Sequence, residues 1–515
     1  MCQVDEDYRE ELGRPAGPSV SKKCVKCKEA SASVVIRAGD AHCRSCFKEN
    51  FVHKFRAMLG KTRLIFPGEK VLLAVSGGPS SCSMLSQVQE GLSQTAHKKL
   101  RFCPGIVYID EGGAVGQSQE DRRRTVAELQ AVFRDTGFPF HTVPLEQVLD
   151  LPSSVLATAL SSPAEPARAY KAAVDQFIQT GSRTGASTGA AVPGPEPALA
   201  EVQESQTLLL QQLLGSVTTL TARQDLLSTL RQHLLVHTAR SQGYSKLMLG
   251  DNCSRLAVKL LSSISLGRGA QLAQDTGYSD SRYGDIVSVR PMREYSSKEI
   301  AFYCRLFNVP SVSTPGLDTK AGEKASIQRL TESFVTRLQA DFPSTVSTIY
   351  RTSEKLQVSC SSSSPAARRT CCLLCMCLLD TALGEASALQ ARLISEQLSQ
   401  TKAAPPAAPG QDPGPGQPES VAPAGAGDCG RSAGSCCSSS GAGDCGSSSP
   451  AQGVETSDLR GLLCYSCQLT VRDMSSLQHL PQYVVSEARR RQRRSVMREE
   501  ISEFLLDQDE DEASN

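Results

Sequence analysis

The stretch KVLLAVSGG at residues 70–78 decides the fold, because a run of apolar residues ends there in a Ser-Gly-Gly turn. Such a run is typical of a buried parallel strand, and the glycines allow a sharp turn into a following helix. The stretch GIVYIDEGG at 105–113 repeats the pattern, and helical sequence with one apolar face follows at 119–137. This alternation of strand and helix predicts a parallel, doubly wound α/β sheet.

Three further segments have the composition of strands in the same sheet: PFHTVPL (139–145), SKLMLG (245–250) and IVSVRPM (286–292). Between and after them, helices are expected at 203–241, 254–265 and 296–307. We therefore predict a five-stranded, mostly parallel sheet within residues 64–350. A Gly-, Ala- and Pro-rich stretch at about 181–200 is interpreted as an insertion loop.

Three further segments have compositions that are not typical of a packed core. Residues 1–20 are expected to form a flexible lead-in. Residues 400–458 are rich in Ala, Pro, Gly and Ser and cannot bury enough apolar surface to offset chain entropy, so we predict a disordered insert. Residues 489–515 form a charged tail, in which the basic run RRRQRR (489–494) precedes many acidic residues. A solvated helix face explains that run better than a nucleic-acid contact or a nuclear address.

The composition limits the possible functions. The 515 residues are 40% hydrophobic, contain no Trp and carry a formal net charge of +1, so any nucleic-acid surface must be local. The acidic N-terminus lacks the apolar core of a secretory signal. The longest strongly apolar stretch, residues 371–379, is far shorter than the roughly 20 residues that span a bilayer. We expect a cytoplasmic protein without membrane contact.

The first cysteine motif lies in a compact module at residues 21–63. Cys24 and Cys27 form one CxxC pair, and Cys43 and Cys46 form a second pair after 15 intervening residues. Two such pairs, brought together by a hairpin, provide the tetrahedral set of sulfur ligands that Zn²⁺ prefers. Four free thiols or a redox CxxC are the alternatives, and the spacing favours an N-terminal zinc ribbon.

A second motif is divided between residues 365–380 and 459–480. Cys372 with Cys375, and Cys464 with Cys467, resemble a second zinc site split by 88 residues. Two alternatives stay open here, because Cys371 and Cys377 compete as ligands and the run CCLLCMCLL is also typical of a buried helix. We predict a split C-terminal zinc ribbon and hence two structural Zn²⁺ ions.

The N-terminal module also carries a local positive charge, with eleven Lys and Arg residues against three acidic ones. A solvated charged face is the ordinary explanation, and contact with nucleic-acid phosphates is slightly favoured over it. The candidate phosphate-contacting residues are Lys22, Lys23, Lys26, Lys28, Arg37, Arg44, Lys54 and Arg56.

The turn SGGPSS (76–81) resembles the SGGxDS motif of the PP-loop ATP pyrophosphatases, which adenylate a substrate and release pyrophosphate. Two other stretches, 247–269 and 290–310, are similar to further motifs of that family. Together with a CxxC pair at each end, they resemble its tRNA 2-thiolation branch. The resemblance implies a PP-loop (HUP-like) fold and covers roughly residues 21–375 and 459–480.

The chain departs from that family at the positions that carry chemistry. Pro79 and Ser80 stand where active members carry Lys and Asp, and Cys253-Ser254-Arg255 replaces an acidic pair. No CxxC pair occurs in residues 145–180, where sulfur-transferring members have catalytic cysteines. We predict no catalytic residue and a degenerate nucleotide-binding turn of Ser76, Gly77, Gly78 and Ser81.

The resemblance implies a non-catalytic, tRNA-binding scaffold subunit. Its implied partner is a catalytic PP-loop subunit, which uses ATP in a heterodimer that 2-thiolates the wobble uridine of lysine, glutamine and glutamate tRNAs. The implied sulfur source is a thiocarboxylated ubiquitin-related modifier. Three alternatives are an active adenylyltransferase with a degenerate loop, a small-molecule PP-loop amidotransferase, and a plain zinc-ribbon adaptor. Enzymatic activity of the isolated chain is not expected.

Overall fold

The computed structural model describes residues 23–36, 40–93, 99–157, 170, 174, 202–353, 371–379, 459 and 461–502. The chain divides into two compact units, residues 1–382 with 454–515 and residues 383–453, and the second lies wholly outside the described ranges. The predicted lead-in, insertion loop and disordered insert also lie outside them, as do Lys22 and Arg37. None of the described helices combines the length and apolar character required to cross a bilayer.

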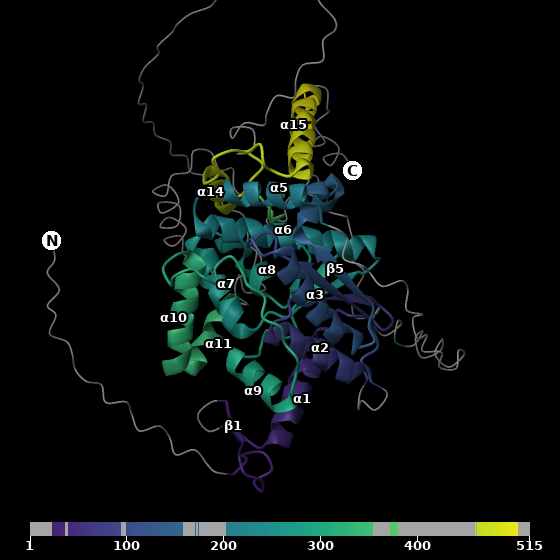
Figure 1. Ribbon diagram of the computed structural model, residues 1–515, viewed down its shortest axis with the longest axis vertical. Helices are drawn as coiled ribbons and strands as arrows, with labels where there is room; N and C mark the ends of the chain where they lie inside the picture. The colour runs from purple at the N-terminus through teal and green to yellow at the C-terminus, as the bar shows by residue number, and fades with distance from the viewer. Residues whose placement is uncertain are drawn as a thin grey trace, which may run out of the picture. The chain divides into compact units, whose positions relative to one another are not determined.

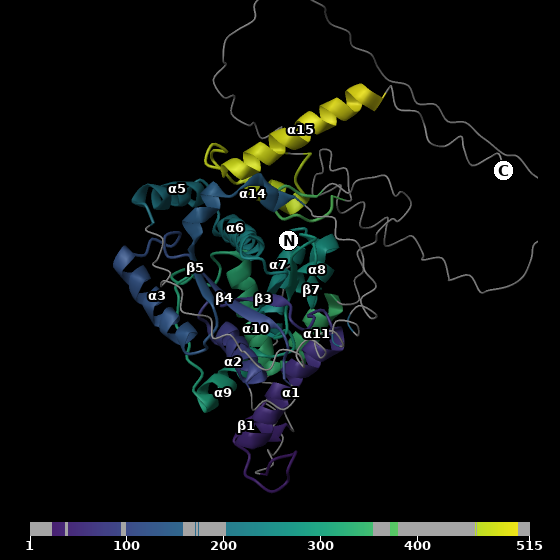
Figure 2. The same ribbon diagram turned by 90° about the vertical axis from the view of Figure 1, so that its right-hand side faces the viewer.

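The centre of the larger unit is a six-stranded sheet with strand order β5-β4-β3-β6-β8-β7 (Figures 1 and 2). All neighbours pair in parallel except β7 and β8. The five predicted strands are present as β3 (Lys70–Ala74), β4 (Cys103–Asp110), β5 (Phe140–Pro144), β6 (Lys246–Leu249) and β8 (Val287–Val289).

The sixth strand corrects the predicted count of five. β7 (Ser279–Asp280) pairs antiparallel with β8 at one edge of the sheet. A strand of two polar residues has no apolar run or alternation, so its sequence gives no strand signal. Its pairing depends on the position of β8.

The strands are apolar because helices cover both faces of the sheet. Val71 and Leu73 of β3 face one hydrophobic core, and Leu72 between them faces the other. The first core is completed by α1 (Arg44–Thr62), α2 (Pro79–Leu92), α3 (Gln119–Arg134) and α9 (Ser297–Phe307). The second is completed by α5 (Glu204–Gly215), α6 (Leu220–Ser241) and two 3₁₀ turns, η1 (Leu145–Asp150) and η2 (Ser153–Leu156).

A third, smaller core lies beside the sheet. There α7 (Cys253–Ser265) packs against α10 (Ile327–Asp341) and α11 (Pro343–Thr352) through Leu256, Val335 and Tyr350. The remaining elements are η3 (Gly269–Gln271), α8 (Leu272–Thr276), α14 (Tyr465–Arg472) and α15 (Gln482–Ser502).

Side-chain caps mark the N-terminal ends of α9 and α7. The Ser296 side chain accepts a hydrogen bond from the Glu299 backbone, and the Glu299 side chain accepts one from the Ser296 backbone, which makes a capping box at α9. Asn252 caps α7 in the same manner by accepting from the Arg255 backbone. The predicted mostly parallel α/β sheet is confirmed, and a four-cysteine group lies in each flanking module where a zinc ribbon was predicted.

Candidate metal centres and the strand-end site

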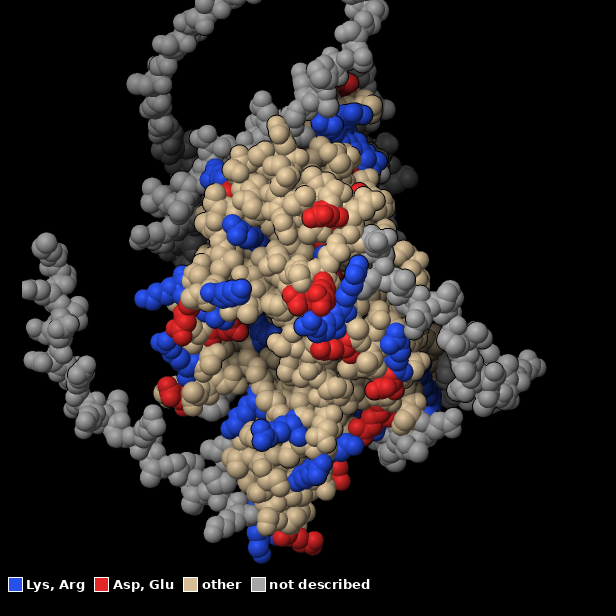
Figure 3. All heavy atoms as spheres, viewed as in Figure 1, with Lys and Arg blue, Asp and Glu red and all other residues tan. Residues whose placement is uncertain are grey.

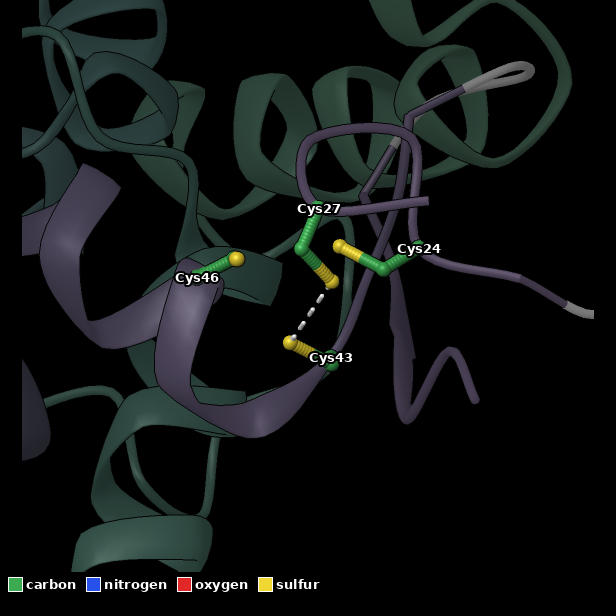
Figure 4. A group of neighbouring side chains, drawn as sticks. All are labelled: Cys24, Cys27, Cys43 and Cys46. Atoms are coloured by element: carbon green, nitrogen blue, oxygen red, sulfur yellow. Dashed lines mark hydrogen bonds between the residues drawn. The ribbon is translucent and has the colours of Figure 1, made fainter. Parts of the chain in front are cut away.

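The first cysteine centre lies in the N-terminal module (Figure 4). The Sγ atoms of Cys24, Cys27, Cys43 and Cys46 all lie within 4.8 Å of one another. The first pair lies in a tight turn, because Lys28 adopts a left-handed φ of 61° and its N–H donates to the Cys24 carbonyl at 2.8 Å. A short hairpin of β1 (Val34–Val35) and β2 (Ala41–His42) then leads to the second pair, which begins α1. The expected hairpin therefore joins a knuckle to the first turn of a helix.

The electrostatics of this centre suit a cation. Backbone N–H groups of Cys27 and Cys43 donate toward Cys24 and lower the pKa of its thiol to about 5. The neighbouring thiols and burial raise the pKa of Cys46 to about 12. Four convergent sulfur atoms, with N–H donors beside one of them, match the soft ligand set of a thiophilic divalent metal.

Aromatic packing attaches the N-terminal module to the sheet. Phe51 of α1 stacks on Tyr303 of α9 with ring centroids 4.0 Å apart and interplanar angle 7°. The Tyr295 hydroxyl donates to the Phe51 carbonyl at 2.5 Å. Phe47, Phe51 and Phe55 are at most 2% exposed, so α1 belongs to the core as well as to the cysteine centre.

The second centre has the same architecture. The Sγ atoms of Cys372, Cys375, Cys464 and Cys467 lie within 4.8 Å of one another, although the two pairs are far apart in sequence. Met376 adopts a left-handed φ of 58° and its N–H donates to the Cys372 carbonyl at 3.1 Å. The backbone N–H of Cys464, which begins α14, donates to the Cys372 Sγ at 3.3 Å. The run 371–379 is therefore a turn, not the buried helix that its composition also permitted.

The second centre is fixed to α6 by a buried histidine. His233 Nε2 lies 2.7 Å from the Leu374 carbonyl, and its Nδ1 lies 2.8 Å from the Tyr483 hydroxyl. A carbonyl can only accept, so Nε2 carries the proton and Nδ1 accepts from the tyrosine. Burial lowers the pKa of His233 to about 4. The neutral imidazole thus connects the cysteine turn, α6 and α15.

Arginines surround the second centre. Arg268 pairs with Asp225 at 2.5 Å, and Asp225 also accepts from Thr470 of α14 at 3.1 Å. Arg282 donates to the Cys375 carbonyl at 3.2 Å. Arg282 also pairs with Asp275 and Asp280, so both arginines already have carboxylate partners and serve mainly to hold the cysteine turn in place.

Several of the basic residues predicted to contact tRNA have partners within the chain. Lys54 pairs with Glu299 at 2.9 Å and lies 4.6 Å from the centroid of the Tyr295 ring. Arg44 donates to the Leu306 carbonyl at 2.6 Å, and Lys26 pairs with Glu49 at 2.8 Å. Figure 3 accordingly shows Lys and Arg side chains interspersed with acidic ones around this module.

The other described members of that set lie at the surface or near it. Lys23 and Lys28 are exposed, and Arg56 is half-buried. A polar hollow of about 240 Å³ lies nearby, and its wall includes Lys54, Glu299, Glu294 and Arg351. The charges in that wall pair with one another, Arg351 with Glu294 at 3.6 Å. Several of the basic residues counted in the N-terminal module therefore pair with acidic or carbonyl groups of the chain itself.

The strand-end turn after β3 has the shape of a phosphate loop. Gly77 adopts a φ of 83°, which a residue with a side chain rarely takes, and Gly78 and Pro79 begin α2. The hydroxyls of Ser76 and Ser81 lie 3.3 Å apart, and Ser81 also donates to the Gly78 carbonyl at 3.0 Å. The four predicted nucleotide-binding residues thus lie together, but their hydroxyls bond to each other and to the turn.

Other parts of the chain cover this turn. The Val312 backbone N–H donates to the Gly77 carbonyl at 2.9 Å, and Thr314 donates to the Ser76 carbonyl at 3.4 Å. From the other side, Ser80 donates to the Gly250 carbonyl at the end of β6 at 2.5 Å. Ser80 and Ser81 are 9% and 5% exposed. The carbonyls of Ser76 and Gly77 are therefore bonded to residues 312–314, and the Ser80 hydroxyl is bonded to the end of β6.

Ion pairs occupy the neighbouring strand ends. Arg122 bonds to Asp110, which ends β4, at 2.8 Å and to both carboxylate oxygens of Glu146 at 2.7 and 3.0 Å. All three side chains are at most 7% exposed. Beyond β4, Arg231 donates to Glu111 at 2.9 Å, and beyond β6, Arg290 donates to Asp251 at 3.3 Å. The carboxylates at these strand ends are neutralised by arginines.

Sequence reasoning did not identify these strand-end arginines or the covering segment at residues 312–314. A lone Arg in a helix such as α3 is usually a solvated residue, so its sequence carries no signal. Of the three successive arginines at 122–124, the structure buries Arg122 and leaves the Arg124 side chain 64% exposed. Only the apolar face of α3 around Val126 and Leu129 could have indicated which arginine points inward.

A family model and two similar proteins carry the name of the tRNA 2-thiolation family that the sequence motifs resemble. A family model described as cytoplasmic tRNA 2-thiolation protein 2 matches residues 326–469. Proteins of that name from Danio rerio and Homo sapiens are 54% and 50% identical, over 99% and 100% of this chain and 100% and 99% of their own lengths. Among solved structures, the U34-tRNA thiolase NcsA from Methanococcus maripaludis with its [4Fe-4S] cluster aligns with a TM-score of 0.43 and 14% identity, over 65% of this chain and 87% of that one.

Proposed function

This chain belongs to the cytoplasmic tRNA 2-thiolation protein 2 family, and we propose that it serves tRNA 2-thiolation as a non-catalytic scaffold subunit. In this proposal its partner is a catalytic PP-loop subunit, which binds ATP and adenylates the tRNA. The chain holds the tRNA and supports the partner in a cytoplasmic heterodimer.

One observation carries the proposal: the strand-end turn is bound on both sides by the chain itself. The Gly77 carbonyl accepts from the Val312 N–H, and Ser80 donates to the Gly250 carbonyl. An Mg·ATP triphosphate at this turn would meet Ser80 where a carboxylate could hold the metal, and the strand-end carboxylates of Asp110 and Asp251 each pair with an arginine. Without a positioned metal, the leaving pyrophosphate lacks a stabilisation of several kcal/mol.

The metal assignment forms part of the same proposal. Cys24, Cys27, Cys43 and Cys46 would hold one Zn²⁺, and Cys372, Cys375, Cys464 and Cys467 a second. Four buried or half-buried thiols with neighbouring N–H donors suit this ion, which supplies folding energy in such closed sites. The cysteines fix the knuckle to the start of α1 in the first module and to the start of α14 in the second.

The substrate assignments rest on the family resemblance. We expect the wobble uridine of lysine, glutamine and glutamate tRNAs to be the modified position, with sulfur from a thiocarboxylated ubiquitin-related modifier. Exposed Lys23 and Lys28 on the N-terminal module are the described residues best placed to contact tRNA phosphates.

The proposal is tested in the assembled heterodimer by following adenylation of tRNA. Ser76→Ala and Ser81→Ala remove the two hydroxyls of the turn without adding bulk. If the chain is a scaffold, tRNA adenylation stays within about twofold of wild type, while a matched substitution in the partner's loop abolishes it. A loss of tenfold or more from the substitutions in this chain, with the heterodimer intact, would support the alternative of an active adenylyltransferase.

A further inference from the structure

Helix α15 divides into a packed first part and an exposed second part. Tyr483 and Ala488 in the first part are at most 2% exposed, and the Tyr483 hydroxyl bonds to His233 of α6. From residue 493 to residue 501, every side chain whose burial the structure describes is exposed. Figure 2 shows this part of the helix extending beyond the other helices. The sequence predicted one solvated face on this helix, whereas the second part is exposed on all of its described sides.

Buried ion pairs fix the first part of α15 in place. Glu487 is 1% exposed and accepts hydrogen bonds from Arg490 at 2.6 Å and from Arg491 at 2.7 Å. Arg491 also donates to the Cys371 carbonyl, beside the second cysteine centre, and to the Leu156 carbonyl at 3.4 Å. These two arginines therefore hold the helix to the rest of the unit, and the exposed part is carried on a rigid base.

Three arginines of the exposed part are available for a ligand. Arg493, Arg494 and Arg498 are exposed, and none of them forms a hydrogen bond or ion pair with another residue in the described part of the chain. At 3.6 residues per turn the three lie within about 140° of arc, on one side of the helix. Figure 3 shows basic side chains gathered over this helix. Arg494 and Arg498 are one turn apart, where like charges repel, so a polyanion bound on that side would stabilise the helix.

We propose that Arg493, Arg494 and Arg498 form an arginine arm that binds the phosphate backbone of the tRNA. This inference rests on the proposed function, which supplies tRNA as the polyanion. A guanidinium group binds two phosphate oxygens through parallel N–H donors, which suits arginine to this contact better than lysine. Contacts to phosphates position the RNA and do not depend on base sequence. The arginine arm is thus a second RNA-binding surface, separate from Lys23 and Lys28.

The composition of the arginine arm favours RNA over a membrane surface as its ligand. Met497 and Ile501 are the large apolar residues on the same side of the helix, and they are 59% and 46% exposed. Two such side chains provide less apolar contact than one myristoyl chain, which itself gives only marginal membrane binding. The arginines therefore supply most of the binding free energy, and their charge matches the phosphates of RNA.

The test measures tRNA binding to the full-length chain at several salt concentrations. The arm variant combines Arg493→Gln, Arg494→Gln and Arg498→Gln, which removes three charges from exposed positions and keeps good helix-forming residues. Its tRNA affinity at about 0.15 M salt should fall at least tenfold. The dependence of log affinity on log salt should fall by about two to three, because each lost phosphate contact removes about one.

The matched control combines Arg123→Gln, Arg124→Gln and Arg337→Gln. These three arginines are also exposed, so the control loses the same charge from other helices. Its tRNA affinity should stay within about twofold of wild type. Equal losses of affinity in the control and in the arm variant would overturn the proposal, because net charge rather than the arginine arm would then govern binding.

The remaining outcomes distinguish the arginine arm from the proposed function. A wild-type chain that binds no tRNA would overturn both. Wild-type binding with an equal affinity in the arm variant would overturn the arm alone, and loss of sedimentation with phosphatidylserine vesicles in that variant would then assign the arm to a membrane. Residues 503–515 contain six acidic residues. An effect of the arm variant that appears only after their deletion would also overturn the proposal, because this segment rather than tRNA would then occupy the arm.

Discussion

Gly250 at the end of β6 lies against Ser81 on the first turn of α2. A methyl group on Gly250 would meet the Ser81 Cα at 2.9 Å and its backbone nitrogen at 3.1 Å. The neighbouring Ser80 donates to the Gly250 carbonyl. Because backbone atoms of the two segments are in contact, no space is left between the first turn of α2 and the end of β6.

Gly250→Ala should therefore destabilise the chain by about 1–3 kcal/mol, since an added methyl must push α2 away from β6. Gly60→Ala in α1 is the matched control, because a Cβ there has nothing within 4 Å. That variant should be more stable by about 0.5–1 kcal/mol, the usual gain from replacing Gly in a helix. Chemical denaturation of both variants measures the difference, and equal stability would contradict the close contact.

Arg122→Met should lower the free energy of unfolding by about 3–5 kcal/mol, because it leaves the buried carboxylates of Asp110 and Glu146 without a counter-charge. Arg124→Met, two residues further along α3 and 64% exposed, should change it by less than about 1 kcal/mol. Urea denaturation of the two variants provides the measurement. A small effect of Arg122→Met would show that the buried triad does not form.

Cys24→Ser combined with Cys27→Ser should release one metal ion and loosen residues 23–46, since a structural zinc supplies folding energy. Beyond Cys46, α1 should stay ordered, because Phe51 and Phe55 remain buried in the main core. Hydrogen exchange followed by mass spectrometry distinguishes these segments. Cys103→Ser, an exposed cysteine outside both centres, is the control. Loss of protection along the whole of α1 would argue that the metal, rather than the aromatic packing, holds the helix.

Lys28→Ala should weaken tRNA binding and reduce the dependence of log affinity on log salt by about one, as expected for one lost phosphate contact. Lys54→Ala should leave tRNA affinity nearly unchanged, because that ammonium already pairs with Glu299. Binding of tRNA to each variant is measured at several salt concentrations. An equal loss of tRNA affinity in both variants would show that Lys54 also contacts tRNA.

The stability of the chain should fall as the pH decreases from about 6.5 to 4, partly through His233. Burial lowers the pKa of this histidine to about 4, below the 6.5 of an unfolded histidine. The unfolded state therefore binds the additional proton in this range, and acidification favours unfolding by about 3 kcal/mol in total.

His233→Gln isolates the histidine's share, because glutamine can still donate toward the Leu374 carbonyl but does not titrate. The difference in unfolding midpoint between pH 7 and pH 5 should be smaller in the variant than in wild type. An identical pH dependence would mean that His233 is not buried as a neutral group.

Much of the fold was predictable because its signals are local. The apolar runs at β3, β4, β5, β6 and β8 predicted a parallel sheet, since strands covered on both faces must be apolar throughout. β7 was missed because its two residues become a strand only through their pairing with Ser288 and Val289. The role of Lys54 stayed open for a related reason, since Glu299, its partner, is 245 residues away in sequence.

The sequence by itself determined that the strand-end turn has lost its acidic and basic residues and that two sets of CxxC pairs exist. These are matters of residue type and short spacing. Only the tertiary structure decided that Val312 and Gly250 contact the turn, that Arg122 rather than Arg124 is buried, and that the Cys372 and Cys464 pairs converge. Each depends on the packing of segments distant in sequence, and burial and hydrogen-bond partners are set by that packing rather than by the neighbouring residues.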